Sequence, residues 1–364
     1  MFFCLGCMTE VQGNTSLCPH CGYRVGTPAK EPYYLEPGTI LQGRYIVGKA
    51  LGAGGFGITY IGYDALLKRK VAIKEYFYRQ CATRESGTNN VKVYTGNAEW
   101  QFKTGLDSFI AEARQLAGFT KISEIADIYD CVLENGTGYI VMEYVQGRDV
   151  RDILQQTRTL PYKEAERIIL AVVRGLSAVH RQGIIHRDIA PDNIMIRNDG
   201  AVKLVDFGAA RQVVAAYSQN LSVIFKSGYA PVEQYQEKGH QGPWTDVYAV
   251  GATMYRMLVG FKPQPSIDRV SEDDLKRPSE LGVQISPHAE RVLMRALAVK
   301  ANERIPNMEV LEQELLREDT SVSMSVPEKE IPAWKTILVF VSTALVTAGL
   351  TWGALNLFNV PWFV

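Results

Sequence analysis

The chain has 364 residues, of which 46% are hydrophobic, and its 39 Lys and Arg residues balance its 39 Asp and Glu residues. This composition excludes a disordered chain and a miniature disulfide-held domain, and the length is enough for roughly two or three domains with buried cores. Zero net charge also argues against bulk attraction of the whole chain to nucleic acid or anionic lipid.

The first 26 residues contain two Cys-x-x-Cys pairs, Cys4 with Cys7 and Cys18 with Cys21. This spacing predicts a structural Zn²⁺ site of four thiolates, because each short gap lets one tight turn aim two sulfurs at one ion. The metal would supply most of the folding energy of so short a segment. Two disulfides or redox thiols are the alternative. Residues 1–26 resemble bacterial zinc ribbons, and the absence of a basic run argues against nucleic-acid binding.

Residues 27–43 contain three prolines, and we expect them to form an extended, solvated linker. Glycines then recur in residues 51–57, LGAGGFG, and the β-branched and aromatic residues 58–61 predict a strand after them. The glycines therefore form the tip of a β-hairpin, where backbone amides can approach nucleotide phosphates. Lys74 ends the strand VAIK, and Glu112 lies in a predicted amphipathic helix, so these two side chains are candidates for an ion pair.

Two further motifs follow in order, IHRDIAPDNIM at residues 185–195 and LVDFG at residues 204–208. With the Gly-rich hairpin and VAIK, they make residues 44–316 resemble the eukaryotic-like (Hanks-type) serine/threonine protein kinases of bacteria. The resemblance implies an α+β, bilobal fold, with a β-rich N-lobe at residues 44–145 and a helical C-lobe at residues 146–316. The zinc ribbon and one C-terminal transmembrane helix would complete the chain.

The resemblance also implies the catalytic roles. Asp188 would orient the substrate hydroxyl and accept its proton, and Asn193 and Asp206 would hold Mg²⁺ or Mn²⁺. Lys74, paired with Glu112, would hold the ATP phosphates. The residues expected to contact ATP are Leu51, Gly52, Ala53, Gly54, Gly55, Phe56, Gly57, Thr59, Ala72, Lys74, Met142, Glu143, Val145, Asp149 and Met195. For Asp149, a ribose contact and a solvated loop position are both open.

The catalytic loop departs from the family at Ala190, where serine/threonine kinases carry a lysine that helps to neutralise the γ-phosphate. Counting back from Glu233 leads to Lys226, and we hypothesise that this lysine of the activation segment fills the vacancy; an exposed loop lysine is the alternative. Because of Ala190, a nucleotide-binding pseudokinase scaffold is the rival function. A membrane-tethered nucleic-acid module is a second rival, disfavoured by the neutral ribbon.

Arg187 precedes the catalytic Asp188, which indicates control by a phosphate on the activation segment. The segment between Asp206 and Glu233 contains no threonine, so the candidate acceptors are Ser218, Ser222, Ser227 and Tyr217. Two structural roles also follow from the resemblance: Glu233 would pair with Arg304, and Asp246 would brace the catalytic loop. The passage from Glu75 to Gly105 is too long for an ordinary loop, and docking insertion and mobile flap are both open.

Residues 336–364 contain no Asp, Glu, Lys, Arg or His. We expect residues 335–358 to form a transmembrane helix, preceded by a juxtamembrane linker at 317–334 and followed by a short external tail at 359–364. A buried core helix is the alternative. Lys329 and Lys335 before the span place the kinase domain in the cytoplasm by the positive-inside rule.

The sequence therefore predicts an ATP- and Mg²⁺-dependent serine/threonine protein kinase, anchored in the cell membrane by a single span. Its expected partners are ATP, cytoplasmic protein substrates and membrane lipid, and nucleic acid is not expected. The resemblance also implies autophosphorylation, which a homodimer would allow in trans.

Overall fold

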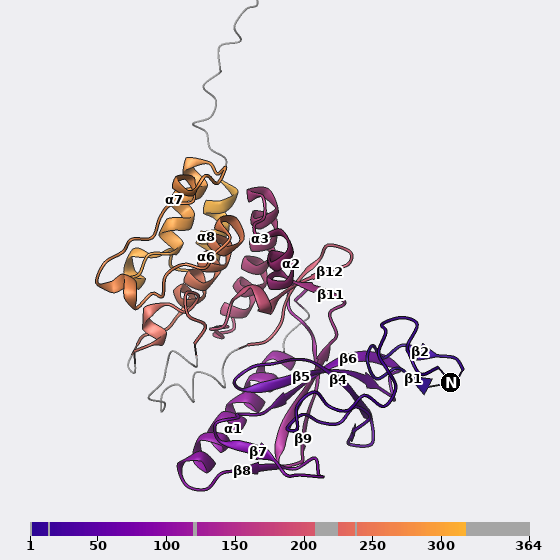
Figure 1. Ribbon diagram of the computed structural model, residues 1–364. Helices are drawn as coiled ribbons and strands as arrows, with labels where there is room; N and C mark the ends of the chain where they lie inside the picture. Colours follow the sequence, from indigo (N-terminus) through magenta and orange to yellow (C-terminus); the bar gives the residue numbers. More distant parts are fainter. Residues whose placement is uncertain (1, 14, 119–121, 208–224, 237–238, 318–364) are drawn as a thin grey trace, which may run out of the picture. The chain divides into compact units, whose positions relative to one another are not determined.

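An antiparallel sheet of six strands, ordered β3-β4-β5-β6-β10-β9, forms the frame of the N-terminal lobe (Figure 1). The computed structural model describes residues 2–13, 15–118, 122–207, 225–236 and 239–317. Its strands are β3 (Ile40–Leu41), β4 (Tyr45–Ala53), β5 (Gly57–Asp64), β6 (Arg69–Tyr76), β9 (Ile128–Glu134) and β10 (Thr137–Glu143). Because alternate residues of these strands are apolar, one face buries a continuous core.

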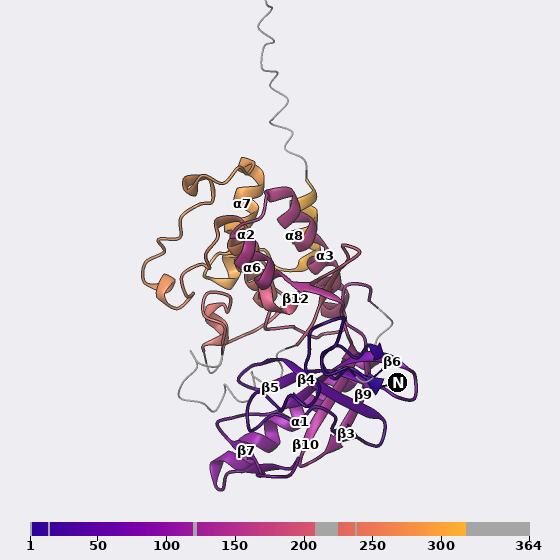
Figure 2. The same ribbon diagram turned by 45° about the vertical axis from the view of Figure 1, so that its right-hand side comes forward.

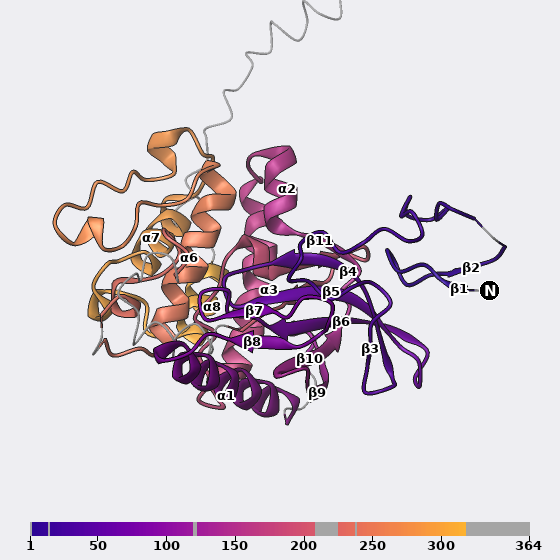
Figure 3. The ribbon, with the colours of Figure 1, turned by 60° about the horizontal axis from the view of Figure 1, so that its bottom comes forward.

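Helix α1 (Asn97–Ala117) packs against β9 and β10 of this sheet (Figure 3). Its buried side chains include Phe102, Phe109, Ile110 and Ala113, whose spacing places them on one face of the helix. Glu112 is also buried on this helix, in the interior of the lobe, as the amphipathic pattern predicted.

The C-terminal lobe is helical and has its own core (Figure 1). Its α-helices are α2 (Val150–Thr157), α3 (Tyr162–His180), α6 (Pro243–Val259), α7 (Pro287–Ala296) and α8 (Met308–Leu316). Its 3-10 helices are η1 (Pro191–Asn193), η2 (Val232–Gln234), η3 (Asp268–Val270), η4 (Ser279–Leu281) and η5 (Ala301–Glu303). A small sheet of β11 (Gly147–Asp149), β12 (Ile194–Arg197) and β13 (Val202–Leu204) carries the segments that flank the site.

Polar caps set several of these helix starts. Ser286 Oγ accepts a hydrogen bond from the backbone N–H of Ala289 at the start of α7, and Asn307 accepts one from Val310 at the start of α8. Such caps satisfy backbone donors that have no partner within the helix. The bilobal α+β architecture expected from the sequence is confirmed in this part of the chain.

The cysteine-rich segment contains the short strands β1 (Phe2–Phe3) and β2 (Glu10–Val11) and packs on the N-terminal sheet (Figure 2). The backbone N–H of Lys49 in β4 donates to the carbonyl of Leu5 at 2.8 Å, and the Phe3 ring lies 4.1 Å from that of Tyr63. Lys70 Nζ donates to Thr9 Oγ1 at 2.8 Å. The segment is therefore attached to the lobe by backbone, polar and aromatic contacts together.

The expectation of a solvated linker at residues 27–43 is wrong for its second half. Leu35 and Leu41 are almost fully buried against the N-terminal sheet, and Leu35 N–H donates to the Tyr60 hydroxyl at 3.0 Å. The physical reason is that packing these leucines and the neighbouring tyrosines on the sheet removes apolar surface from water. This gain in free energy outweighs the preference of the prolines for an extended, solvated backbone.

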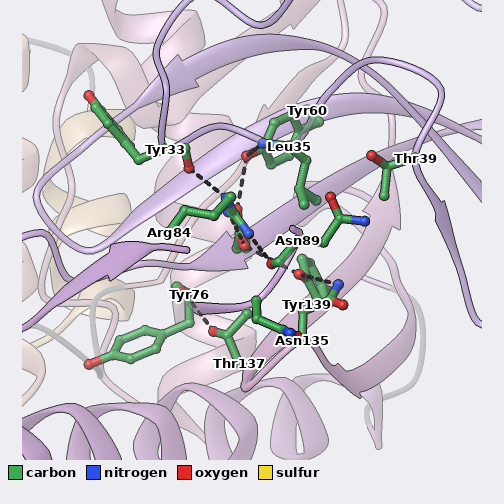
Figure 4. A network of polar contacts seen from close by, with 12 residues as sticks. Tyr33, Leu35, Thr39, Tyr60, Tyr76, Arg84, Asn89, Asn135, Thr137 and Tyr139 are labelled. Carbon is green, nitrogen blue, oxygen red and sulfur yellow. Dashed lines mark hydrogen bonds and ion pairs between the residues drawn. The ribbon is translucent and has the colours of Figure 1, made fainter. Parts of the chain in front are cut away.

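The long passage after Glu75 contains a hairpin of β7 (Ala82–Arg84) and β8 (Val91–Val93), held to the lobe by a buried polar network (Figure 4). Arg84 pairs with the fully buried Glu75 at 2.6 Å and donates to the carbonyl of Tyr33 at 2.9 Å. The hydroxyls of Tyr60 and Tyr139 also donate to the Glu75 carboxylate. The passage is an ordered part of the lobe.

No helix within the described ranges is long and apolar enough to cross a membrane. The predicted span 335–358 and tail 359–364 lie outside the described residues, as does the predicted juxtamembrane linker beyond Arg317.

Candidate active site

The buried carboxylate of Asp246 in α6 holds the catalytic loop, residues 186–193, through hydrogen bonds to its backbone. Asp246 accepts hydrogen bonds from the backbone N–H groups of His186 at 2.8 Å and Arg187 at 2.7 Å, and its Oδ2 lies 2.7 Å from His180 Nε2. Burial alone would raise the pKa of Asp246, but these partners hold it below its usual value. The predicted brace is therefore confirmed.

A second contact joins this loop to the segment that carries Asp206. The His186 ring stacks on Phe207 with centroids 4.2 Å apart, and Arg187 and Asp206 both have positive φ, 67° and 69°. A non-glycine residue in the left-handed region is strained and persists only where its surroundings impose it. Packing and Asp246 therefore fix the backbone that presents Asp188 and Asp206.

Asp188 is buried, and the amide of Asn193 donates to both its backbone carbonyl and its Oδ2, each at 2.7 Å. Because Nδ2 makes both bonds, the Asn193 side-chain oxygen is directed away from Asp188. Asn193 and Asp206 line one cleft. One amide oxygen and one carboxylate are hard oxygen donors that suit Mg²⁺, so the residues fit the predicted metal.

Lys74, in β6, forms its ion pair with Asp206. The sequence predicted a pair with Glu112, but no ion pair among the described residues joins Lys74 to Glu112, although both line one cavity with Asp206. Burial lowers the pKa of the Arg187 guanidinium, and the nearby carboxylates of Asp246 and Glu112 only partly oppose this. Lys74 instead pairs with Asp206, which lines the same cavity and lies within ion-pair distance of its ammonium group.

Lys226 lies at the catalytic loop. Its Nζ is 3.3 Å from Oδ2 of Asp188 and 2.6 Å from Oδ1 of Asp192. Ala190, between these two carboxylates in the chain, is buried and carries no charge. The structure thus places Lys226 beside the carboxylate of Asp188, the position predicted from its spacing to Glu233.

A cleft of about 170 Å³ lies under the Gly-rich hairpin. Seven of the residues predicted to contact ATP line it: Gly52, Ala53, Gly54, Phe56, Gly57, Thr59 and Lys74. Met142 lines the adjoining cavity with Glu112. The other predicted ATP residues line neither cavity: Leu51, Gly55, Ala72, Glu143, Val145, Asp149 and Met195.

Two of these residues have other contacts in the structure. Glu143 Oε2 accepts from Lys203 Nζ at 2.8 Å. Asp149 accepts from the backbone N–H of Asp152 at 2.7 Å and so caps the start of α2, a role not predicted from the sequence. Sequence reasoning also missed Arg151 and Asp192, which line the cleft. Asp192 lies within the catalytic motif, whereas nothing in the sequence pattern marks Arg151.

The tip of the Gly-rich hairpin is attached to the segment that follows β6. The backbone N–H of Phe77 donates to the carbonyl of Phe56 at 3.0 Å, and the Phe56 ring stacks on Tyr78 with centroids 4.8 Å apart and planes 13° apart. Phe56 is consequently buried. The long passage after Glu75 therefore holds the hairpin that covers the cleft.

The far end of the activation segment is anchored as predicted. Glu233 Oε1 pairs with Arg304 at 2.7 Å, and both side chains are buried. Arg187 Nε donates to Gln241 Oε1 at 3.0 Å. Ser227 is half-buried in this segment, whereas Tyr217, Ser218 and Ser222 lie outside the described residues.

The four N-terminal cysteines converge. Their sulfur atoms all lie within 4.8 Å of one another, with Cys4 and Cys21 Sγ 3.6 Å apart and Cys7 and Cys18 Sγ 3.9 Å apart. Tetrahedral Zn–S bonds of about 2.3 Å place sulfurs about 3.8 Å apart. These separations fit a four-thiolate Zn²⁺ site and exceed the bond length of a disulfide, about 2 Å.

A sequence model of the protein kinase domain matches residues 45–316. Serine/threonine-protein kinase PknL of Mycobacterium tuberculosis is 29% identical over 319 residues, covering 86% of this chain and 74% of that protein. A probable serine/threonine-protein kinase PknB of Corynebacterium glutamicum is 33% identical over 231 residues, covering 62% of this chain and 32% of that protein. The solved structure "PpkA-294 apo form" is 33% identical, covering 78% of this chain and 99% of that one with a TM-score of 0.71. The chain belongs to the protein kinase family and is a serine/threonine protein kinase. The family implies ATP, Mg²⁺ or Mn²⁺, and protein substrates.

Proposed function

We propose that this kinase transfers the γ-phosphoryl group of ATP to serine or threonine hydroxyls with Lys226, from the activation segment, as the cation of its catalytic loop. The observation that carries the proposal is the 3.3 Å separation of Lys226 Nζ and Asp188 Oδ2. Phosphoryl transfer builds up charge on the equatorial oxygens, so a fixed cation there stabilises the transition state. Lys226 also lines the nucleotide cleft, which puts its ammonium within reach of those oxygens.

The other residues of the site have separate roles in the transfer. Asp188, oriented by Asn193, aligns the acceptor hydroxyl and takes its proton. Lys74, which lines the same cleft, holds phosphate oxygens. Asn193 and Asp206 would hold Mg²⁺, which neutralises charge on the phosphates when it is bound.

The direct test is phosphate transfer from labelled ATP and Mg²⁺ by the full-length protein, to itself and to a generic protein substrate. Transfer by the wild type that Asp188→Asn abolishes supports the proposal. Transfer that persists in Asp188→Asn would remove Asp188 as the base. Nucleotide binding without transfer in either protein would support the alternative that Ala190 favours, a pseudokinase scaffold.

Three further features belong to the proposal. The four cysteines bind one structural Zn²⁺, which the sulfur separations support. Autophosphorylation in trans within a homodimer would modify Ser218, Ser222 or Ser227, and Arg187 would hold the phosphate. The apolar stretch 335–358 anchors the chain in the cell membrane with the kinase domain in the cytoplasm, a proposal that rests on the sequence alone.

A further inference from the structure

A second cavity, of about 250 Å³, lies beside the nucleotide cleft in the C-terminal lobe. The two share Arg151, Asp192 and Lys226, so these side chains form the wall between them. Lys226 is also the residue next to Asp188. Through Lys226, a group in the second cavity would therefore lie near the hydroxyl that Asp188 orients.

Four cations and one carboxylate line this second cavity. The cations are Arg151, Lys226, Arg256 and Lys262, and the carboxylate is Asp192. Asp192 already accepts from Lys226 at 2.6 Å and lies 3.8 Å from Arg151. Arg256 and Lys262, in contrast, form no ion pair with a carboxylate anywhere in the part of the chain that the structure describes. The cavity consequently carries an excess of positive charge.

The backbone around the cavity is closely packed. Gly228 has φ 91°, and a Cβ at this position would lie 2.7 Å from the carbonyl oxygen of Pro263 and 3.2 Å from Lys262. Ser266 Oγ donates to the carbonyl of Ala230 at 2.8 Å. The loop that carries Lys262 is thus fixed against the activation segment. The Arg256 side chain is also held, because its Nη1 donates to the carbonyl of Arg158 at 3.0 Å.

We propose that this cavity binds an acidic side chain of the protein substrate, one or two residues from the phosphorylated serine or threonine. The inference rests on the proposed kinase function and names its substrate class. Neighbouring Cα atoms are 3.8 Å apart, so a residue in a cavity that shares Lys226 with the catalytic site is a near neighbour of the acceptor. A carboxylate there meets the unpaired cations Arg256 and Lys262.

The test uses the full-length protein and short peptides with a single serine, in which Asp, Ala or Lys is placed in turn at the two positions on either side. At one position we expect Asp to raise kcat/KM about tenfold over Ala, and Lys to lower it. The advantage should shrink as salt is added. Because a ratio between peptides is measured, a general loss of activity in a variant cancels.

Substitutions of residues that line the cavity then test whether the cavity causes the preference for Asp over Ala. Arg256→Gln should reduce the Asp/Ala ratio several-fold, and Lys262→Glu should shift the preference from Asp towards Lys. Lys300→Gln, an exposed lysine paired with Glu303 elsewhere, is the matched control and should leave the ratio unchanged. A phosphate on Ser227, which also lines the cavity, is the other anion these cations could hold; an Asp preference that persists in Ser227→Ala assigns the site to the substrate.

The outcomes distinguish the proposed site for an acidic side chain from the proposed kinase function. Transfer to peptides with no acidic preference at any position, or with a preference that both cavity variants leave intact, would overturn this inference alone. A preference lost in Ser227→Ala but kept in Arg256→Gln would do the same. Failure of the wild type to transfer phosphate to itself, to a protein substrate and to every peptide would overturn the proposed function with it.

Discussion

The ammonium of Lys226 lies 3.3 Å from Oδ2 of Asp188, beside the uncharged Ala190 of the catalytic loop. The relationship joins two segments that are far apart in the sequence, the catalytic loop and the activation segment. A lysine within the catalytic loop would be present whenever that loop is folded. Because Lys226 belongs to the activation segment, the cation reaches Asp188 only when that segment is folded onto the C-terminal lobe. The proposed role of Lys226 would therefore couple catalysis to the conformation of the segment.

Removing the ring of Tyr78 should weaken ATP binding. This ring stacks on Phe56 at the tip of the Gly-rich hairpin, and aromatic pairs contribute about 0.5–1.5 kcal/mol beyond their buried area. We expect Tyr78→Leu to raise the KM for ATP by about two- to tenfold, measured by steady-state kinetics. Tyr78→Phe keeps the ring and loses only the hydrogen bond to Gln80, so its KM should equal that of the wild type. Equal effects of both variants would rule out the stacking argument.

Arg84→Met should destabilise the N-terminal lobe strongly, because it leaves the Glu75 carboxylate buried without its cation. Breaking a buried pair from one side costs about 3–5 kcal/mol. The measurement is the free energy of unfolding in urea. Arg79→Met, an exposed arginine of the same passage, should cost less than about 1 kcal/mol. A loss of less than about 1 kcal/mol for Arg84→Met would mean that the hairpin is not integral to the lobe.

The purified protein should contain one Zn²⁺ per chain, and Cys7→Ser should lose it. The sulfurs of Cys7 and Cys18 are 3.9 Å apart, and a serine hydroxyl replaces one thiolate poorly. Cys131→Ser, which changes a cysteine outside the cluster, should keep the metal. Metal analysis and thiol titration measure both variants. Metal-free wild type with fewer than six free thiols would contradict the site.

Stability should fall on acidification through His186. Burial lowers the pKa of His186 to about 4, against the opposing pull of Asp246 and other nearby carboxylates. The unfolded chain takes up this proton near pH 6.5 and the folded protein only near pH 4, so the unfolded state binds more protons in between. This histidine should therefore account for a loss of about 2 kcal/mol in unfolding free energy from pH 7 to pH 5.

The control for this pH effect is His186→Phe, which keeps a ring against Phe207 and removes the titrating nitrogen. Its unfolding free energy should fall less than that of the wild type over the same pH range, by the amount due to the histidine. Parallel pH profiles of the two proteins would show that His186 carries no such effect.

The parts of the site that lie in contiguous motifs could be predicted from the sequence. The loop at residues 185–195 contains Asp188 and Asn193 within a few residues, so its motif fixes their mutual geometry. The pair of Glu233 with Arg304 and the brace from Asp246 also follow from motifs with set partners. The spacing back from Glu233 predicts the position of Lys226, and its catalytic role stays a prediction.

The contacts that depend on packing between distant segments could not be predicted. The burial of Leu35 and the bond from Arg84 to the carbonyl of Tyr33 require the sheet to bring those segments together. The ion pair of Lys74 with Asp206 depends on side-chain distances that motif spacing does not contain. The cap formed by Asp149 is a local pattern, whereas the sequence left a ribose contact and a solvated loop position open for this residue.

The turnover of Lys226→Ala, compared with that of the double variant Lys226→Ala/Ala190→Lys, tests the central claim most directly. At saturating ATP and Mg²⁺, we predict that Lys226→Ala lowers kcat by about 100-fold or more, because a fixed cation is lost from the transition state. The double variant, which returns a lysine to the catalytic loop, should recover most of that loss. A wild-type kcat in Lys226→Ala would contradict the account.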